Sequence, residues 1–150
     1  MQSSKSAGVA DNPEILEEQE QLAIKYEEEG KIEEAMFLWR QIEREQARYI
    51  AAPFHLGMLY RQQHEYEESI KAFQRALTIK PDFSDVYYQL GLVYNDLKMD
   101  DDAINMYKAV LQLDAKNRDV HRQLALTYHR NGKIKEATKH YQFAAGQPES

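Results

Sequence analysis

An internal repeat with a constant step of 34 residues constrains this chain more than any other feature of its sequence. Four segments carry a leucine, then a small residue, then a tyrosine three positions later. They are Leu22-Ala23 with Tyr26, Leu56-Gly57 with Tyr60, Leu90-Gly91 with Tyr94, and Leu124-Ala125 with Tyr128. A period of this length indicates stacked supersecondary units, each of which buries its apolar face on its neighbour. The sequence therefore predicts four copies of one structural unit.

A second pattern in the same register predicts that each copy is a pair of helices. In every copy a small residue is followed four positions later by an aromatic residue: Ala35 and Trp39, Ser69 and Phe73, Ala103 and Tyr107, Ala137 and Tyr141. Residues four apart lie on one face of a helix. The small side chain lets two helices approach, and the aromatic ring fills the space beside it.

These positions resemble the tetratricopeptide-repeat family, whose pattern has Leu-Gly, Tyr, Ala, Phe, Ala and Pro at the same offsets. The resemblance covers about residues 16–145 and implies an all-α fold, a right-handed α-solenoid of helix-turn-helix repeats. We expect a repeat region at 13–145, a disordered N-terminal tail at 1–12 and a C-terminal tail at 146–150. The expected repeats are about 16–49, 50–83, 84–117 and 118–147.

Apolar periodicity and turn residues predict eight helices and no strand. Gly30 and Gly132 separate the two helices of the first and last copies, where a left-handed cap is often required. The middle copies have His64 and Lys98 at this place. The expected helices cover about 13–29, 31–46, 50–63, 66–79, 84–97, 100–113, 118–131 and 134–145.

Composition argues against several classes of function. The chain has no cysteine, which excludes disulfides and cysteine-based zinc sites, and its formal charge of -6 argues against nucleic acid as a partner. No stretch approaches the roughly 20 apolar residues of a membrane span, so we expect a cytoplasmic protein. The histidines lack metal-binding spacing, and the sequence has neither a phosphate loop nor a nucleophile elbow. We therefore expect no enzymatic activity and no cofactor or metal.

Charge is distributed unevenly along the sequence. Residues 14–34 contain nine glutamates and two lysines, whereas residues 116–140 contain seven Lys or Arg and two acidic residues. Such runs usually keep a surface solvated. The alternative is a self-associating scaffold, in which the acidic first repeat of one molecule meets the basic fourth repeat of another, head to tail.

The resemblance also implies where a partner binds, because the family usually binds extended peptides or helices on the concave surface lined by the first helix of each repeat. Phe54 and Tyr88 favour contact with a partner, since exposed apolar strips commonly mark partner sites. For Met58, Leu92 and Leu126, core packing fits equally well. The predicted groove residues are Phe54, Met58, Arg61, Tyr88, Leu92, Asn95, Arg122, Leu126, His129 and Arg130, and the predicted acidic end is Glu17, Glu20, Glu27 and Glu28.

Two expectations about the partner follow. Some family members clamp the C-terminal carboxylate of chaperones with Lys, Asn and Arg, but the matching positions here are Glu20, Ile24, His55, Asp85 and Gln89. Because Glu20 and Asp85 would repel a carboxylate, we expect no chaperone-tail clamp. We expect a protein or peptide partner instead, held by an adaptor or scaffold, with basic residues near the acidic end and acidic residues near Arg122 and Arg130.

Overall fold

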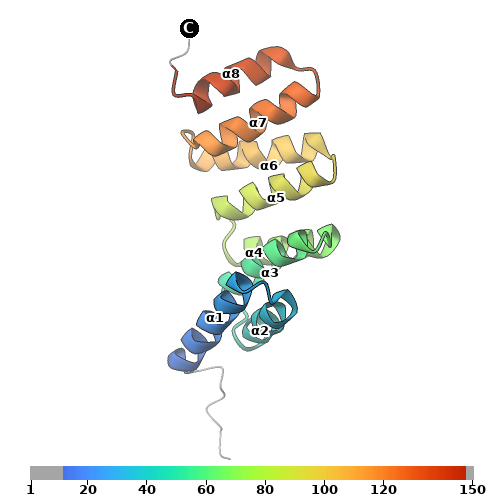
Figure 1. Cartoon of the computed structure of the whole chain (residues 1–150). Coiled ribbons are helices and arrows are strands. Elements are labelled where there is room, and N and C mark those ends of the chain that lie inside the picture. Colours follow the sequence, from blue (N-terminus) through green and yellow to red (C-terminus); the bar gives the residue numbers. More distant parts are fainter. Residues whose placement is uncertain (1–11, 148–150) are drawn as a thin grey trace, which may run out of the picture. The chain divides into compact units, whose positions relative to one another are not determined.

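Eight helices and no strand make up residues 12–147, the part of the chain that the computed structural model describes (Figure 1). Every helix end lies within one residue of its predicted position, so the prediction of an all-α fold is confirmed. The helices are α1 (Pro13–Glu28), α2 (Ile32–Glu45), α3 (Ala51–Gln62), α4 (Tyr66–Ile79), α5 (Ser84–Asp96), α6 (Asp100–Leu113), α7 (Arg118–Arg130) and α8 (Ile134–Ala144).

The two predicted tails lie mostly outside the described residues. Of the N-terminal tail, 1–12, only Asn12 is described, and its Oδ1 accepts a hydrogen bond from the Glu14 N–H at 3.0 Å. Asn12 is therefore the cap of α1, because this bond satisfies one of the amides that a helix start leaves unpaired. Of the C-terminal tail, 146–150, only the first two residues are described.

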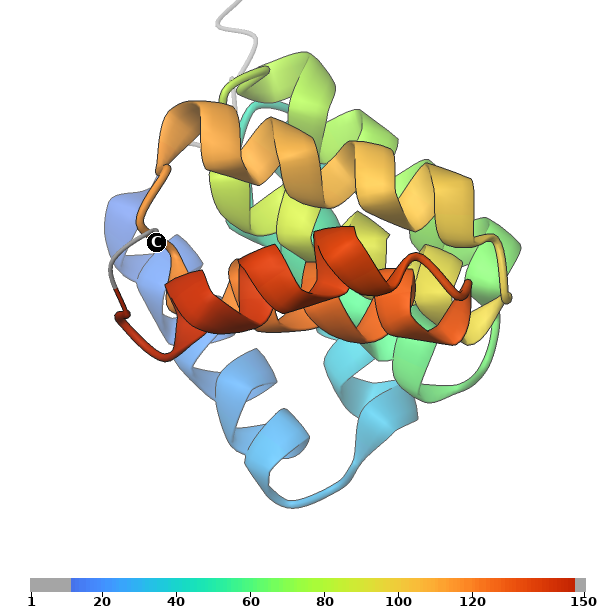
Figure 2. The same cartoon turned by 90° about the horizontal axis from the view of Figure 1, so that it is seen from above.

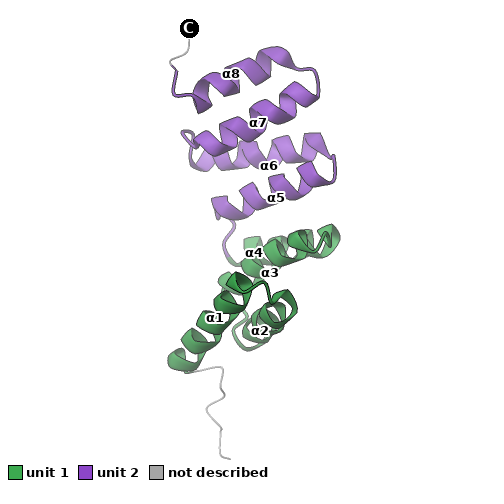
Figure 3. Cartoon of the chain, in the orientation of Figure 1, with its two compact units in different colours: residues 1–79 green, residues 80–150 purple. Residues whose placement is uncertain are grey.

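The helices form two compact units, α1–α4 within residues 1–79 and α5–α8 within residues 80–150 (Figure 3). In unit 1, α1 packs against α2, α2 against α3, and α3 against α4. Unit 2 repeats this order with α5 to α8. The last hairpin is clear in two views, where α7 and α8 run side by side (Figure 1, Figure 2). Each unit thus contains two helical hairpins in sequence.

Close approach between the helices of a hairpin confirms the predicted role of the small residues. A Cβ atom on Gly57 would lie 2.5 Å from Cε1 of the buried Phe73, so α3 and α4 touch at a point where only glycine fits. Gly91 faces the ring of Tyr107 in the same way. Ser69, the small residue of α4, donates its hydroxyl to the carbonyl of Gly57 at 2.6 Å.

The turns inside the hairpins share one backbone conformation. Gly30 and Gly132 have φ of 72° and 73°, as the prediction of a left-handed cap requires. His64 and Lys98 adopt the same conformation with φ of 61°. Side chains other than glycine pay roughly 1–2 kcal/mol for it, because Cβ comes close to the following carbonyl oxygen. The repeat geometry therefore overrides local preference in the two middle hairpins.

Candidate functional site

The predicted acidic end lies on α1, and half of it takes part in bonds within unit 1. Glu17 and Glu28 are exposed, whereas Glu20 and Glu27 are half-buried. Glu20 Oε2 accepts a hydrogen bond from the Tyr49 hydroxyl at 2.7 Å. Burial, reinforced by this bond, raises the pKa of Tyr49 to about 12. A ligand at Glu20 would therefore have to compete with Tyr49.

Glu27 is the centre of a polar bridge that joins three helices of unit 1. Its Oε1 accepts a bond from Trp39 Nε1 at 2.5 Å and lies 2.9 Å from Nδ1 of His55. Because a carboxylate only accepts, His55 must donate through Nδ1. The rings of Trp39 and His55 stack at 4.3 Å between centroids. Glu27 thus connects α1 to α2 of its own repeat and to α3 of the next.

The groove residues predicted on α3 are all half-buried: Phe54, Met58 and Arg61. The Phe54 ring lies edge-on to His55 at 5.9 Å and is tilted against the buried Phe73 at 6.2 Å. Phe54 therefore contributes to the packing of α3 on α4, and only part of its surface is open to a partner.

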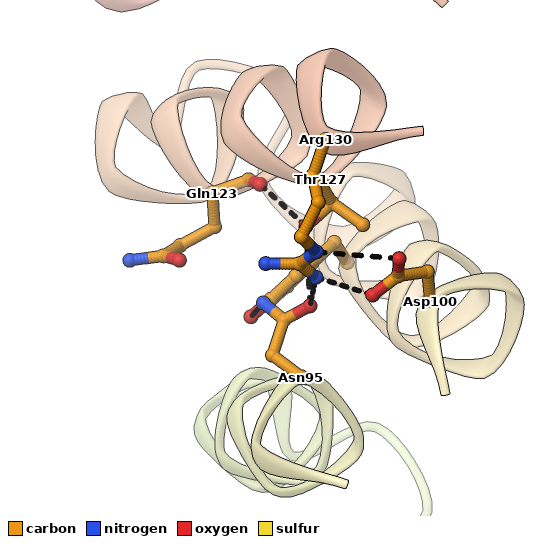
Figure 4. Close-up of polar contacts among 6 residues, drawn as sticks. Asn95, Asp100, Gln123, Thr127 and Arg130 are labelled. Carbon is orange, nitrogen blue, oxygen red and sulfur yellow. Dashed lines mark hydrogen bonds and ion pairs between the residues drawn. The ribbon is translucent and has the colours of Figure 1, made fainter. Parts of the chain in front are cut away.

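In unit 2, Asn95 occupies the position that Glu27 has in unit 1, two periods later in the sequence. Its Nδ2 donates to the Tyr107 hydroxyl at 2.7 Å, and its Oδ1 accepts from Thr127 Oγ1 at 3.2 Å. Oδ1 also accepts a hydrogen bond from Nη2 of Arg130 at 3.0 Å (Figure 4). The same guanidinium donates to the carboxylate of Asp100 through Nε and Nη2. Asn95 thus links α5 to α6 and to α7, as Glu27 links α1 to α2 and α3.

The remaining groove residues of unit 2 differ widely in exposure. Tyr88 and Leu92 are half-buried and pack against the core of the unit, with the Tyr88 ring tilted against Tyr107 at 6.1 Å. Leu126 is 46% exposed, so the core interpretation is wrong for this residue. His129 is exposed and lies edge-on to Tyr141 at 6.4 Å.

The predicted basic side of the groove already has acidic partners. Arg122 pairs with Asp119 one turn earlier on α7, at 3.1 Å, and both side chains are exposed. Arg130 is held by Asp100, and the hydrogen bond to Asp100 raises its pKa above the usual value. Both arginines therefore have carboxylates beside them, which weakens the argument for an acidic partner segment at this place.

A cavity of about 200 Å³ opens beside Tyr88 in unit 2. Its chemistry combines an aromatic ring, an apolar residue, two carboxylates and small polar groups. The lining residues are Ser84, Asp85, Tyr88, Val110, Asn117 and Asp119. Because carboxylates and an aromatic face both attract cations, this cavity suits a basic side chain.

Two histidines that are 19 residues apart in the sequence meet between α7 and α8. Nδ1 of His121 lies 2.9 Å from Nδ1 of His140, and Nε2 of His121 lies 2.9 Å from the Ala115 carbonyl. Since His121 donates its Nε2–H to that carbonyl, its Nδ1 accepts a hydrogen bond from the Nδ1–H of His140. Burial, followed by the charges of His121, Lys139 and Lys108, lowers the pKa of His140 to about 4. His140 is therefore neutral at neutral pH, and the two stacked rings contribute to the packing of α7 on α8.

Two general properties of the described helices bear on function. Within residues 12–147, no three His, Cys, Asp or Glu side chains lie close enough together to hold a metal ion. None of α1–α8 combines the length and the apolar character that crossing a membrane requires.

Sequence-family models match the middle of the chain. A model described as TPR repeat matches residues 57–98, and one described as tetratricopeptide repeat matches residues 84–117. Together the matches cover residues 57–117, from within α3 to the residue before α7. The chain therefore contains tetratricopeptide repeats. No curated protein sequence matches this repeat protein.

Solved structures show the same fold. A crystal structure of MamA is 25% identical, with a TM-score of 0.82, and the match covers 92% of this repeat protein and 81% of MamA. MamA from Desulfovibrio magneticus RS-1 is 19% identical with a TM-score of 0.79, covering 90% and 75% of the two chains. The pilF protein of Pseudomonas aeruginosa is 21% identical with a TM-score of 0.81, covering 95% and 65%. The repeat protein therefore has the all-α fold of the tetratricopeptide solenoids.

Proposed function

We propose that this repeat protein is a non-enzymatic adaptor, whose first helices bind a peptide or a helix of a partner protein. Tetratricopeptide repeats are protein-interaction modules, and the proposal assigns the contact to α5 and α7 of unit 2. The cavity beside Tyr88 carries the argument, since it places an aromatic ring next to the carboxylates of Asp85 and Asp119. The exposed Leu126 on α7 adds an apolar contact.

The same observations modify the expected chemistry of the partner. Arg122 and Arg130 are paired with Asp119 and Asp100, so unit 2 does not favour an acidic segment. We expect the bound segment to carry a Lys or Arg side chain that enters the cavity beside Tyr88, next to an apolar residue. A basic group there gains from the Asp85 carboxylate and from the ring face, whereas Asp119 is already paired with Arg122.

A peptide selection with matched variants tests this proposal. Peptides enriched from a random library by the native protein should contain a basic residue beside an apolar one, and their affinities are measured by fluorescence anisotropy. Leu126→Glu should weaken binding roughly tenfold or more, since an apolar contact residue is replaced by a charge. Leu113→Glu is the control, because Leu113 is exposed to a similar extent, 49%, at the end of α6.

The outcome separates the possibilities. Equal weakening by both variants would place the contact elsewhere, and the absence of any enriched peptide would contradict the adaptor. Circular dichroism confirms that both variants are folded.

A second candidate function is self-association into a scaffold. It is supported by the opposite charges of the first and last repeats and by apolar side chains exposed on α2 and α8, among them Phe37 and Ile134. It uses other residues than the groove, so the two candidates are tested independently.

A further inference from the structure

An apolar cavity of about 380 Å³ lies on the outer face of the first hairpin, between α1 and α2. Leu22 and Phe37 in its lining are 40% and 60% exposed. Tyr26 and Leu38 complete the apolar wall, and two glutamates of the first turn of α2, Glu33 and Glu34, stand at its edge. Apolar side chains gathered in this way on a surface commonly mark an interaction site. We call this surface the head face.

Register with the other repeats explains why the head face is apolar. The residues matching Leu22 in the later repeats are Leu56, Leu90 and Leu124, and all three are buried. Leu56 belongs to one core cluster with Trp39 and Ile42 of the preceding α2. Leu124 likewise shares a cluster with Tyr107 and Val110 of the preceding α6. Inside each unit, a leucine at this position is thus covered by the second helix of the repeat before it.

The complementary half of such a contact is exposed on α8. Tyr141 is 37% exposed, although the matching residues Trp39, Phe73 and Tyr107 are completely buried. Ala144 is half-buried, whereas the matching Ile42 is completely buried. We call this surface, Tyr141 and Ala144 with the neighbouring lysines of α8, the tail face. It presents the side chains that cover a leucine like Leu22 inside the units.

We infer that the head face of one molecule binds the tail face of a second copy of this chain, reproducing the contact between successive repeats. The inference rests on the second candidate function, self-association, and not on the groove. Leu22 of one copy then occupies, against Tyr141 of the other, the place that Leu124 has against Tyr107 within unit 2. Unlike faces meet in this contact, so it can be repeated from copy to copy.

Charge complementarity identifies the second copy as the occupant. Glu43 of α2 pairs with Arg75 of α4 at 2.7 Å, so successive second helices come within ion-pair distance of each other. In a second copy stacked in the same way, the acidic first turn of α2, with Glu33 and Glu34, approaches α8, which carries the exposed Lys135 and Lys139. Opposite charges at the edge of an apolar contact steer association and fix its register.

Reversal of the charges tests the inference by sedimentation velocity. The native protein should gain mass with concentration at about 0.02 M salt and return to monomer near about 0.5 M, where surface charges are screened. Glu33→Lys/Glu34→Lys and Lys135→Glu/Lys139→Glu should each weaken association roughly tenfold or more, because like charges then meet. A mixture of the two variants should associate again, since a lysine head face then meets a glutamate tail face.

The matched control changes the same pair of residues one period later, Glu67→Lys/Glu68→Lys on α4, where both side chains are also exposed. This control should associate as the native protein does. A native protein that stays monomeric at low salt would overturn both the inference and the scaffold. If it associates while the head-face variant and the control behave alike, or the mixture does not recover, the scaffold stands and the assigned faces are wrong. Peptide binding through the groove is unaffected in either case.

Discussion

Glu27 in unit 1 and Asn95 in unit 2 occupy the same position of their repeats, yet they build their bridges with different chemistry. Glu27 receives two donors, Trp39 Nε1–H and His55 Nδ1–H, so an acceptor-only carboxylate fits. Asn95 faces a tyrosine hydroxyl that accepts and two groups that donate, so an amide fits. The repeat register therefore decides where a bridge forms, and the neighbouring side chains decide its chemistry.

Removing the two bridges should give the largest difference between the units. Glu27→Ala should lower the free energy of unfolding by roughly 3 kcal/mol, because the indole N–H of the buried Trp39 loses its partner. Asn95→Ala should cost only about 1–2 kcal/mol, since Arg130 keeps Asp100 and Thr127 keeps the carbonyl of Gln123 as partners. Urea unfolding followed by circular dichroism measures both values.

Glu27→Gln is the control for the first bridge. Both bonds go to the same oxygen of Glu27, so an amide oxygen can accept them without the negative charge. More than half of the lost stability should return. If the alanine and glutamine variants are equally destabilised, the bridge is not the cause.

Alanine at the two tight glycines should have the next largest effect. Gly57→Ala and Gly91→Ala should each cost about 2 kcal/mol, because the added methyl group overlaps a buried ring. Gly91→Ala should cost more of the two, since displacing Tyr107 also disturbs its bond with Asn95. The double variant Gly91→Ala/Asn95→Ala should then be less than additive. Additive losses would show that the close approach and the bridge are independent.

Acid should weaken unit 2 through His140. Its pKa is about 4 in the folded protein and near the ordinary value of 6.5 when unfolded, so the unfolded chain binds a proton first as the pH falls. The contribution of neutral His140 to stability is therefore fully present above about pH 6.5 and is lost as the pH falls toward 4. This loss lowers the free energy of unfolding by roughly 2 kcal/mol after allowance for partial exposure. Thermal unfolding at pH 7 and pH 4.5 tests this by circular dichroism.

Two features of the chain sharpen this experiment. Trp39 is the single tryptophan, so its fluorescence reports on unit 1 alone. His140→Asn keeps a donor near the position of Nδ1 without a titrating ring, and it should flatten the acid decline. A decline of equal size in this variant would assign the acid sensitivity to other groups.

The smallest effects are expected at the left-handed turns. Lys98→Gly should stabilise the protein by about 0.5–1 kcal/mol, because glycine adopts φ of 61° without the Cβ contact. His64→Gly should gain less, since it also removes the bond between His64 Nδ1 and the Tyr66 hydroxyl at 2.8 Å. Gly132→Ala should lower stability by about 1 kcal/mol. Melting temperatures of the three variants give the order, and an equal gain at His64 and Lys98 would show that the Tyr66 bond contributes nothing.

Local signals in the sequence were enough for the helices but not for the candidate site. Helix ends follow from apolar period and from turn residues such as Gly30, both of which are readable within one repeat. The bonding partner of a polar side chain cannot be read within one repeat, because Arg130 bonds to Asp100 and Glu27 bonds to His55, each about 30 residues away in the sequence. Each of these groups had several neighbours of suitable charge, and packing in three dimensions selected one. The groove residues and the repeat boundaries stay predictions.

The bridge at Glu27 also bears on how such a chain can evolve. Its three members lie on α1, α2 and α3, so the complete helices that carry them cover residues 13–62, a segment longer than a single 34-residue repeat. Duplication or exchange of one repeat would separate Glu27 from His55 and bring in a neighbour selected for another partner. Recombination that preserves this contact must move three consecutive helices together, and the inherited module is then one and a half repeats long.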